Sequence, residues 1–468
     1  MLDLVKKTLR YAEKISDYAE VRFENAKTNK IIIKNGNLEA TEINKSFGIS
    51  IRLLKNGFLG FVSTNDLKLS NLKQYVNKAL KLAKYSKNIL KKPIILSEEK
   101  TFKDKYTVKQ KTKLENVSLE DKIKKIFEIE KELLKTKIKL PIRFFEYVDE
   151  TREKIFINSE GSLIQSKIPR ITFEYIITFV SNGFSEQRSF QYGASGGWEQ
   201  FKKWKLKQKI LDEAKILPKI AKTKKLPTGK YDVILSSELT GIASHESCGH
   251  PYEADRILGR EAAQAGKSFV KKEMLGERIG TEVVNVVDDP TVPNSYGFYL
   301  YDDEGIKAQR RFLIKNGIIN SFLQNRQTAA EFETNTNASS RANEWFSEPI
   351  VRMANTFVLP GNYNFEELLE TIKNGVYIKS FMEWNIDDKR YHQKYTGLES
   401  YLIKNGKISK LVKTPALEIT TPAFWSSIDA VGKDLGFIAG FCGKSDPMQP
   451  IPVWLGGPTI RLRNIVLV

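Results

Sequence analysis

The chain has 468 residues, 41% of them hydrophobic, which is enough for two domains or slightly more with sizeable cores. Its two distant cysteines exclude a disulfide framework, and free thiols are typical of a cytoplasmic protein. The formal net charge is +19, and the lack of an apolar run of about 18 residues excludes a helical membrane span. Residues 1–15 are predicted to form an amphipathic, charged helix without the apolar segment of a signal peptide.

Asn-Gly pairs punctuate the chain, and five of the six lie between apolar runs, which is the strongest short-range signal for a β-hairpin. These five are Asn35-Gly36, Asn56-Gly57, Asn182-Gly183, Asn316-Gly317 and Asn405-Gly406. The sixth, Asn374-Gly375, is predicted to end a helix that Asn364-x-x-Glu367 begins. A further helix is predicted over residues 118–134 from its apolar spacing. The pattern indicates an α+β fold that is antiparallel and β-rich with inserted helices.

A lysine-rich segment divides the chain. Between Lys202 and Lys225, ten lysines face only Asp212 and Glu213, with no arginine and one aromatic residue. Nucleic-acid surfaces usually include arginine and aromatic side chains. We therefore interpret the segment as a solvated helix and linker, with a polyanion-binding surface as the alternative, and do not expect nucleic acid as a partner. The domain boundary is placed near residue 225, which gives an N-terminal α+β domain (1–225) and a C-terminal β-rich domain (226–468).

Two of the three histidines lie in one string, His245-Glu246-Ser247-Cys248-Gly249-His250. Imidazole nitrogen binds zinc well, and a glutamate beside the first histidine can act as general base. Zinc peptidases commonly space these histidines i and i+4, on one helical face. The spacing here is i, i+5, which a regular helix would splay by about 140°. The segment must therefore contain a π-bulge or end its helix inside the motif, and Pro251 favours the second alternative. Ordinary helix histidines are the competing interpretation.

A third ligand is needed, and the candidates are Cys442, Cys248, His392 and a carboxylate. Cys442 stands in Gly440-Phe441-Cys442-Gly443, where flanking glycines let the backbone approach a crowded site. A thiolate there would complete a His₂Cys set with an open fourth position, the pattern of a catalytic zinc. The alternative is that Cys442 is a small buried hydrophobic residue.

Other short strings extend the pattern over most of the chain. They are Tyr18-Ala19-Glu20-Val21-Arg22, Phe47-Gly48-Ile49-Ser50-Ile51-Arg52, Gly60-Phe61-Val62-Ser63-Thr64, Asp302-Asp303-Glu304-Gly305, Arg352-Met353-Ala354-Asn355-Thr356, Phe441-Cys442-Gly443-Lys444 and Gly456-Gly457-Pro458-Thr459. Together with the histidine motif, they make the chain resemble the TldD/PmbA family of zinc metallopeptidases, on the TldD side that keeps the metal motif.

The resemblance implies a zinc ion (Zn2+) held by His245, His250 and Cys442, with Glu246 as general base. It implies hydrolysis of peptide bonds in short or unfolded polypeptides. It also implies a homodimer, or a heterodimer with a paralogue that lacks the metal motif.

Three further groups near these strings carry weaker expectations. The acidic string 302–305 is predicted to be a surface turn, with a hard-cation site as the alternative. Glu253 and Asp255 follow the histidine motif closely enough to orient a histidine ring, although a solvated loop explains them equally well. His392 is expected to be a surface or structural residue.

The function we expect is metal-assisted amide hydrolysis, in which zinc-bound water is the nucleophile and Glu246 removes its proton. The first alternative is a non-catalytic, metal-stabilised binding module with a basic surface. The second alternative is a cysteine hydrolase that uses Cys248 with His250. It is weak because neighbours on one turn rarely meet as nucleophile and base.

Overall fold

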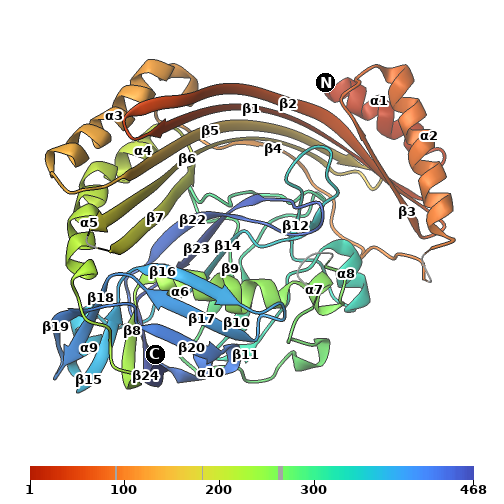
Figure 1. The fold of residues 1–468 in the computed structure, drawn as a ribbon. Helices are drawn as coiled ribbons and strands as arrows, with labels where there is room; N and C mark the ends of the chain where they lie inside the picture. The colour runs from red at the N-terminus through yellow and green to blue at the C-terminus, as the bar shows by residue number, and fades with distance from the viewer. Residues whose placement is uncertain (90–91, 182, 262–266) are drawn as a thin grey trace.

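The computed structural model of the chain describes residues 1–89, 92–181, 183–261 and 267–468. The first half of the chain forms a curved sheet that arches over the second half (Figure 1). This N-terminal sheet contains β1 (Tyr18–Lys34), β2 (Asn37–Lys55), β3 (Phe58–Thr64), β4 (Lys103–Thr107), β5 (Ile142–Asn158), β6 (Leu163–Ser181) and β7 (Phe184–Ser195). The order is β3-β2-β1-β5-β6-β4, with β7 also paired to β6. β4 runs parallel to β6, whereas the other pairs are antiparallel.

Helices cover the two ends of the N-terminal sheet. α1 (Leu2–Ala12) and α2 (Leu69–Ser86) pack at the end that includes β3, and α3 (Leu119–Lys135), α4 (Glu199–Lys203) and α5 (Leu206–Ala221) pack at the other end (Figure 1). The helix predicted at 118–134 is confirmed as α3, where the Ser118 hydroxyl accepts a hydrogen bond from the Asp121 N–H at 3.0 Å. The predicted N-terminal amphipathic helix is confirmed as α1. None of the described helices is long and apolar enough to cross a membrane.

The second half of the chain forms two sheets with a buried helix between them. The larger sheet contains β8 (Gly229–Leu235), β15 (Asn374–Ile378), β16 (Phe381–Ile386), β17 (His392–Gly397), β18 (Ser400–Lys404), β19 (Lys407–Val412), β20 (Ala416–Thr420), β21 (Ile428–Val431) and β24 (Ile460–Leu467). The smaller contains β9 (Val286–Asp288), β10 (Arg311–Lys315), β11 (Ile318–Ile319), β14 (Asn355–Val358), β22 (Gly436–Cys442) and β23 (Ile451–Gly457). α6 (Ser237–Ser244) packs between β8 and the trio β14, β22 and β23. The predicted α+β, β-rich fold with inserted helices is therefore confirmed.

Short elements complete this half. They are α7 (Ala254–Ile257), α8 (Arg326–Glu331), α9 (Phe365–Glu370), α10 (Thr421–Ser427), and the strand pair β12 (Ser340–Arg341) and β13 (Ile350–Val351). Several of them lie in the loops that face the N-terminal sheet (Figure 1).

The Asn-Gly hairpins form where the sequence predicts them. In the turns β1–β2, β2–β3, β10–β11 and β18–β19, both residues of the pair have positive φ, as a two-residue hairpin requires. In the β6–β7 turn, Asn182 lies outside the described residues. The prediction for Asn374-Gly375 is wrong: α9 begins at the predicted cap, Asn364, but ends at Glu370. Asn374 and Gly375 instead open β15, because this strand pairs with both β8 and β18.

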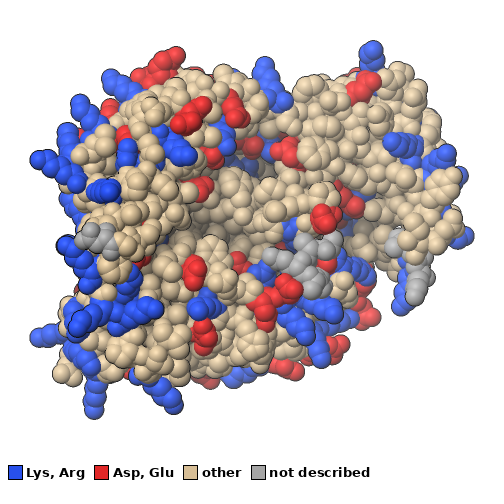
Figure 2. Space-filling model, in the orientation of Figure 1, with Lys and Arg blue, Asp and Glu red and all other residues tan. Residues whose placement is uncertain are grey.

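The lysine-rich segment forms α5 and its flanks. Ile210, Ala214 and Leu217 are buried on one face of the helix, whereas all ten lysines between 202 and 225 are exposed. Lys and Arg side chains also gather along the left edge of the molecule, where Figure 1 places α3, α5 and β19 (Figure 2). The predicted helix is confirmed with its lysines exposed. The choice of a solvated face over a polyanion-binding surface stays a prediction, as does the boundary near residue 225, between α5 and β8.

The acidic turn 302–305 is buried beneath the N-terminal sheet, so the prediction of a surface turn is wrong. Arg52 of β2 contacts Glu304 at 2.7 Å and Glu20 of β1 at 2.8 Å. Lys154 of β5 donates to Asp303 Oδ1 at 2.8 Å. Cations from the sheet can hold these carboxylates away from water because the charges are paired and hydrogen-bonded. The turn therefore joins the two halves of the molecule.

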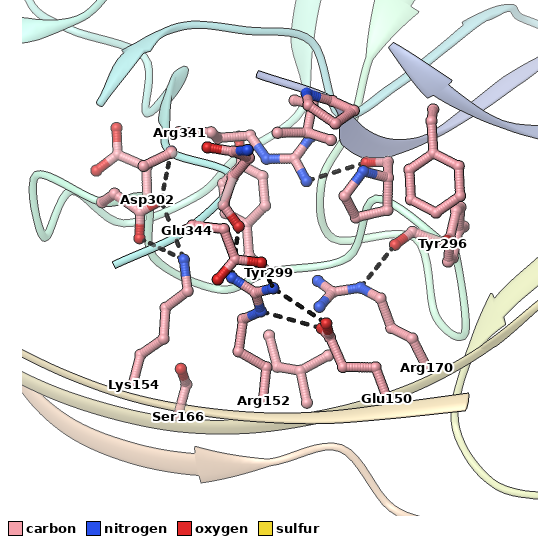
Figure 3. A pocket seen from close by; sticks show the side chains of 18 of the residues that line it. Glu150, Arg152, Lys154, Ser166, Arg170, Tyr296, Tyr299, Asp302, Arg341 and Glu344 are labelled. Carbon is pink, nitrogen blue, oxygen red and sulfur yellow. Dashed lines mark hydrogen bonds and ion pairs between the residues drawn. The ribbon is translucent and has the colours of Figure 1, made fainter. Parts of the chain in front are cut away.

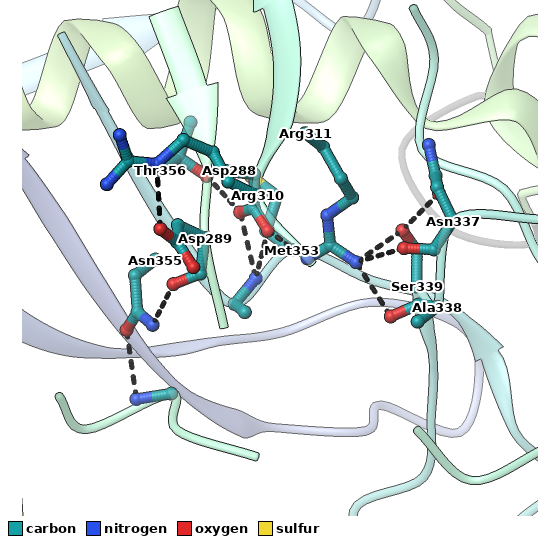
Figure 4. A network of polar contacts seen from close by, with 12 residues as sticks. Asp288, Asp289, Arg310, Arg311, Asn337, Ala338, Ser339, Met353, Asn355 and Thr356 are labelled. Carbon is teal, nitrogen blue, oxygen red and sulfur yellow. Dashed lines mark hydrogen bonds and ion pairs between the residues drawn. The ribbon is translucent and has the colours of Figure 1, made fainter. Parts of the chain in front are cut away.

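A second polar network supports the segment that precedes and opens β14 (Figure 4). Asp288 is buried and accepts hydrogen bonds from the Arg311 guanidinium, from the Ala354 N–H at 2.9 Å and from the Thr356 hydroxyl at 2.7 Å. Because every partner donates to the charged carboxylate, the network holds this segment rigidly beside α6.

Candidate metal centre and active site

The histidine motif forms a π-helical turn at the end of α6. The turn spans His245–Gly249, and the His250 N–H donates to the His245 carbonyl, five residues earlier. This wider turn brings residues i and i+5 together, so the imidazole centroids lie 4.8 Å apart with their planes at 79°. The alternative of a π-bulge is thus correct, and the preferred alternative, a helix end inside the motif, is wrong. His250 keeps helical angles (φ −60°, ψ −47°) although Pro251 follows it.

Cys442 reaches this turn from β22, far along the chain. Its Sγ lies 3.5 Å from His250 Nε2, and the potential ligand atoms of His245, His250 and Cys442 all lie within 4.8 Å of one another. All three side chains are buried. The packing of α6 on β22 and β23 brings them together. Of the flanking glycines, Gly443 lies under the exposed side chain of Met448, whose Sδ would be 2.5 Å from a Cβ there, whereas at Gly440 the nearest atom is at an ordinary 3.4 Å.

The charges around the group favour a thiolate. Burial alone would raise the pKa of Cys442, but His250, Arg352 and His245 hold this pKa well below its usual range. Arg352 fixes the same residue through its backbone, because its guanidinium donates to the Cys442 carbonyl. Burial opposes the charged form of His250, yet Cys442 and Glu253 raise the pKa of the ring.

These residues suit a metal ion by their chemistry. Two imidazoles and a thiolate are ligands that zinc prefers. His245 Nδ1 is buried and has no hydrogen-bond partner among the described residues, which leaves this nitrogen available as a ligand. The group is also the cluster of metal-binding side chains that stands out in the described part of the chain.

Glu246 lies beside the group in the same cavity, which has a volume of about 630 Å³ and is called the metal cavity below. Arg390 Nη1 donates to Glu246 Oε2 at 2.6 Å and fixes the carboxylate. Sequence reasoning missed Arg390, which is 144 positions away and carries no local signal. Glu174 of β6 and Trp384 of β16 line the cavity from its other sides. The metal cavity therefore lies between the N-terminal sheet and the second half of the chain.

One of the two acidic residues after the motif orients a ring. Glu253 Oε2 lies 3.1 Å from His250 Nδ1, the carboxylate contact that commonly fixes a metal-binding histidine. Lys444 lies 3.3 Å from this carboxylate and 2.7 Å from Asp255. Asp255 contacts Lys444 and no histidine ring in the described structure, so the expectation holds for Glu253 and is wrong for Asp255.

The remaining ligand candidates lie elsewhere. Cys248 is fully buried in the hydrophobic core, where burial and Asp288 raise the pKa of its thiol well above the usual range. A thiol in this state is neither a good ligand nor a nucleophile. His392 is exposed at the start of β17 and does not join the group.

Comparison with known families finds metallopeptidase relatives along most of the chain. Three family profiles match the chain, namely PmbA/TldA metallopeptidase domain 1 at residues 19–83, the central domain at 112–221 and the C-terminal domain at 228–468. A metalloprotease from Methanocaldococcus jannaschii is 35% identical over 454 residues, which cover 96% of each chain. A zinc metalloprotease TldD homolog from Saccharolobus solfataricus is 24% identical and covers 98% of each chain.

Solved structures share the fold along the whole chain. A Thermotoga maritima protein described as a candidate modulator of a DNA gyrase has a TM-score of 0.79 at 18% identity, covering 100% of both chains. TldE from Thermococcus kodakarensis has a TM-score of 0.76 at 15% identity, covering 99% of this chain and 100% of its own. At these identities the likeness concerns the fold alone.

Proposed function

Because the chain belongs to the PmbA/TldD family of metallopeptidases, we propose that it is a zinc-dependent peptidase that hydrolyses peptide bonds in short or unfolded polypeptides. The observation that carries the proposal is the group of His245, His250 and Cys442 beside Glu246 in one cavity. Enzymes that use a metal for hydrolysis place the metal ligands and a carboxylate together at the wall of a cavity.

The candidate ligands, Glu246 and Arg390 have separate roles in this mechanism. A zinc ion held by His245, His250 and Cys442 would polarise the scissile carbonyl and lower the pKa of water. Glu246 takes the proton of the attacking water on its carboxylate and later gives it to the leaving amine. Arg390 holds the carboxylate in place by its 2.6 Å contact.

The position of the cavity supports a preference for flexible substrates. The three ligand side chains are buried, and the cavity has walls from β6, β7 and β16. An extended chain can enter such a space and lay its backbone along a strand edge, whereas a folded domain cannot. We therefore propose that native globular proteins are spared.

The ligand assignment is tested by metal analysis of purified variants. His245→Ala, His250→Ala and Cys442→Ala should each reduce bound zinc to well below one per chain. Cys248→Ala is the matched control and should keep zinc, because this thiol lies in the core. If Cys442→Ala retains stoichiometric zinc and hydrolysis, the assignment is wrong and Glu253 becomes the candidate.

Glu246→Gln separates an enzyme from a metal-stabilised binding module with a basic surface. This variant should keep its zinc and lose about 10²–10⁴-fold in the hydrolysis rate of an unstructured peptide, the usual contribution of a general base. Equal rates for wild type and variant would exclude the proposed mechanism. Chelation adds a second test, because a cysteine hydrolase would survive removal of the metal.

A further inference from the structure

A second cavity, of about 240 Å³, lies against β5 and β6 on the side of the sheet that faces the second half of the chain, and is called the arginine cavity here (Figure 3). Phe441 lines both this cavity and the metal cavity. Cys442 follows Phe441 directly, and Ile451, the partner of Cys442 in the β22–β23 register, also lines the arginine cavity. The second cavity therefore lies next to the metal cavity, with Phe441 between them.

Most charges in the arginine cavity neutralise one another. Arg152 binds both oxygens of Glu150 at 3.0 Å and Glu344 at 2.9 Å, and Lys154 pairs with the buried acidic turn. The Asp302 carboxylate accepts backbone N–H groups at 3.0 Å. The lining thus carries four acidic and four basic side chains, and among the described residues Arg152 and Lys154 are the basic ones that form direct ion pairs.

Two arginines stand apart from these pairs. Arg170 comes from β6 of the N-terminal sheet and Arg341 from β12 on the opposite side (Figure 3). Arg170 donates to the carbonyls of Tyr296 and Phe298, each at 3.0 Å. Arg341, only 6% exposed, donates to the carbonyls of Met353 and Pro452 at 2.6 and 3.0 Å. Among the described residues, no carboxylate forms an ion pair with either guanidinium.

Neither guanidinium has a direct ion-pair partner among the described residues. Burial lowers the pKa of Arg341 to about 10, with Arg170 and Arg352 acting in the same direction and Tyr299 and Asp303 opposing them. Burial and Arg152 also lower the pKa of Arg170, and Glu150 opposes this shift only in part. The cavity therefore holds two buried cations to which a bound carboxylate would supply a direct partner.

We propose that the arginine cavity is a substrate subsite in which Arg170 and Arg341 bind a carboxylate of the peptide. The inference rests on the proposed function, since a peptide carries carboxylates in two places, on its acidic side chains and at its C-terminus. A guanidinium held by backbone carbonyls on one side presents its remaining N–H groups in a fixed direction, which suits a planar carboxylate. Acidic or free C-terminal peptides should therefore bind better than neutral, amidated ones.

The test measures binding and not turnover. Unlabelled, N-acetylated peptides of eight residues are titrated into zinc-loaded Glu246→Gln protein, and isothermal titration calorimetry gives each dissociation constant. The first peptide has uncharged side chains and a free C-terminus, and the second is its C-terminal amide. The third is a set of amides in which one residue is replaced by glutamate, at a different position in each peptide. At least one acidic form should bind about tenfold or more tightly than the neutral amide. A gain for the free acid alone identifies the chain end as the ligand, and a gain for glutamate alone identifies a side chain.

Variants then locate the effect. The affinity for the tightest-binding acidic peptide is divided by the affinity for the neutral amide. Arg170→Gln and Arg341→Gln should each bring this ratio towards one. Arg170→Lys should keep part of the preference because it retains the charge. Lys105→Gln, the loss of an exposed cation on β4, should leave the ratio unchanged. Equal affinity of the Glu246→Gln protein for acidic and neutral peptides overturns the inference even if the arginine variants do not fold. Because cleavage is not measured, failure of the peptidase proposal is detected separately by the hydrolysis assay.

Discussion

At the residue scale, metal binding depends on the side chains that orient His250 as well as on the candidate ligands His245, His250 and Cys442. Glu253 contacts His250 Nδ1 at 3.1 Å, and Lys444 holds Glu253 at 3.3 Å. His250 is therefore fixed on one ring nitrogen while the other faces Cys442 at 3.5 Å. A ring held in this way presents its second nitrogen without losing rotational freedom on binding.

Glu253→Gln should weaken metal binding about 10–100-fold, the usual effect of removing such a carboxylate partner. Competition with a chelator of known affinity measures the change. Asp255→Asn removes a neighbouring carboxylate that contacts Lys444 but no histidine ring, and should have a clearly smaller effect. Equal losses in the two variants would contradict a specific role of Glu253 in orienting His250.

At the scale of elements, the site depends on how closely α6 lies on β23. Gly241 makes this approach possible, because a Cβ at this position would lie 2.9 Å from the backbone carbonyl carbon and oxygen of Leu455. Backbone atoms in a paired strand cannot move aside cheaply. The π-helical turn then carries the histidines from α6 towards Cys442 on β22, the neighbour of β23.

Gly241→Ala should therefore lower the free energy of unfolding by about 1–3 kcal/mol and reduce zinc occupancy as well. Urea unfolding and metal analysis measure the two effects. Gly229→Ala is the matched control, since its Cβ would meet the Tyr231 ring at an ordinary 3.4 Å. A Gly241→Ala protein as stable and as metal-loaded as the control would show that the helix has room to shift.

At the scale of the whole molecule, buried ion pairs join the N-terminal sheet to the second half of the chain. Arg52 contacts Glu20 and Glu304, and the side chains of all three are almost inaccessible to solvent. The metal and arginine cavities both have walls from the two halves. The ion pairs therefore maintain the geometry of both cavities.

Arg52→Met should destabilise the protein by about 3–5 kcal/mol, because two carboxylates would remain buried without their cation. The midpoint of urea unfolding measures this change. Lys125→Met removes a cation from an exposed pair with Glu128 and should cost less than about 1 kcal/mol. Similar shifts in both variants would mean that water reaches Glu20 and Glu304 when Arg52 is absent.

Assembly belongs to the same scale, and we propose a dimer, either of this chain or with a paralogue that lacks the metal motif. Light scattering after size exclusion should give twice the 53.5 kDa of one chain. The same preparation should cleave an unfolded protein and spare its native form, because the metal group is buried. A monomer that degrades native globular proteins would contradict both expectations.

The sequence by itself determined the features that local chemistry controls. An Asn-Gly pair can adopt positive φ at both positions wherever it stands, and Ser118 can cap α3 through a hydrogen bond three residues away, so these turns and this helix follow from the sequence. The histidine spacing likewise demanded a distorted helix. Only the tertiary structure decided which distortion occurs, a π-helical turn and not a helix end, because Pro251 restricts its neighbour weakly compared with the packing of α6.

Tertiary structure also decided everything that depends on partners distant in sequence. The turn 302–305 has the composition of a surface loop, yet cations on β2 and β5 bury it. Asn374 and Gly375 have the residue types of a helix end, but pairing with β8 and β18 makes them a strand. No sequence signal indicates the contact of Arg390 with Glu246, or that Arg170 and Arg341 stand in one cavity without an ion-pair partner among the described residues. Local propensity acts over a few residues, whereas burial and charge pairing act between segments that only the folded chain brings together.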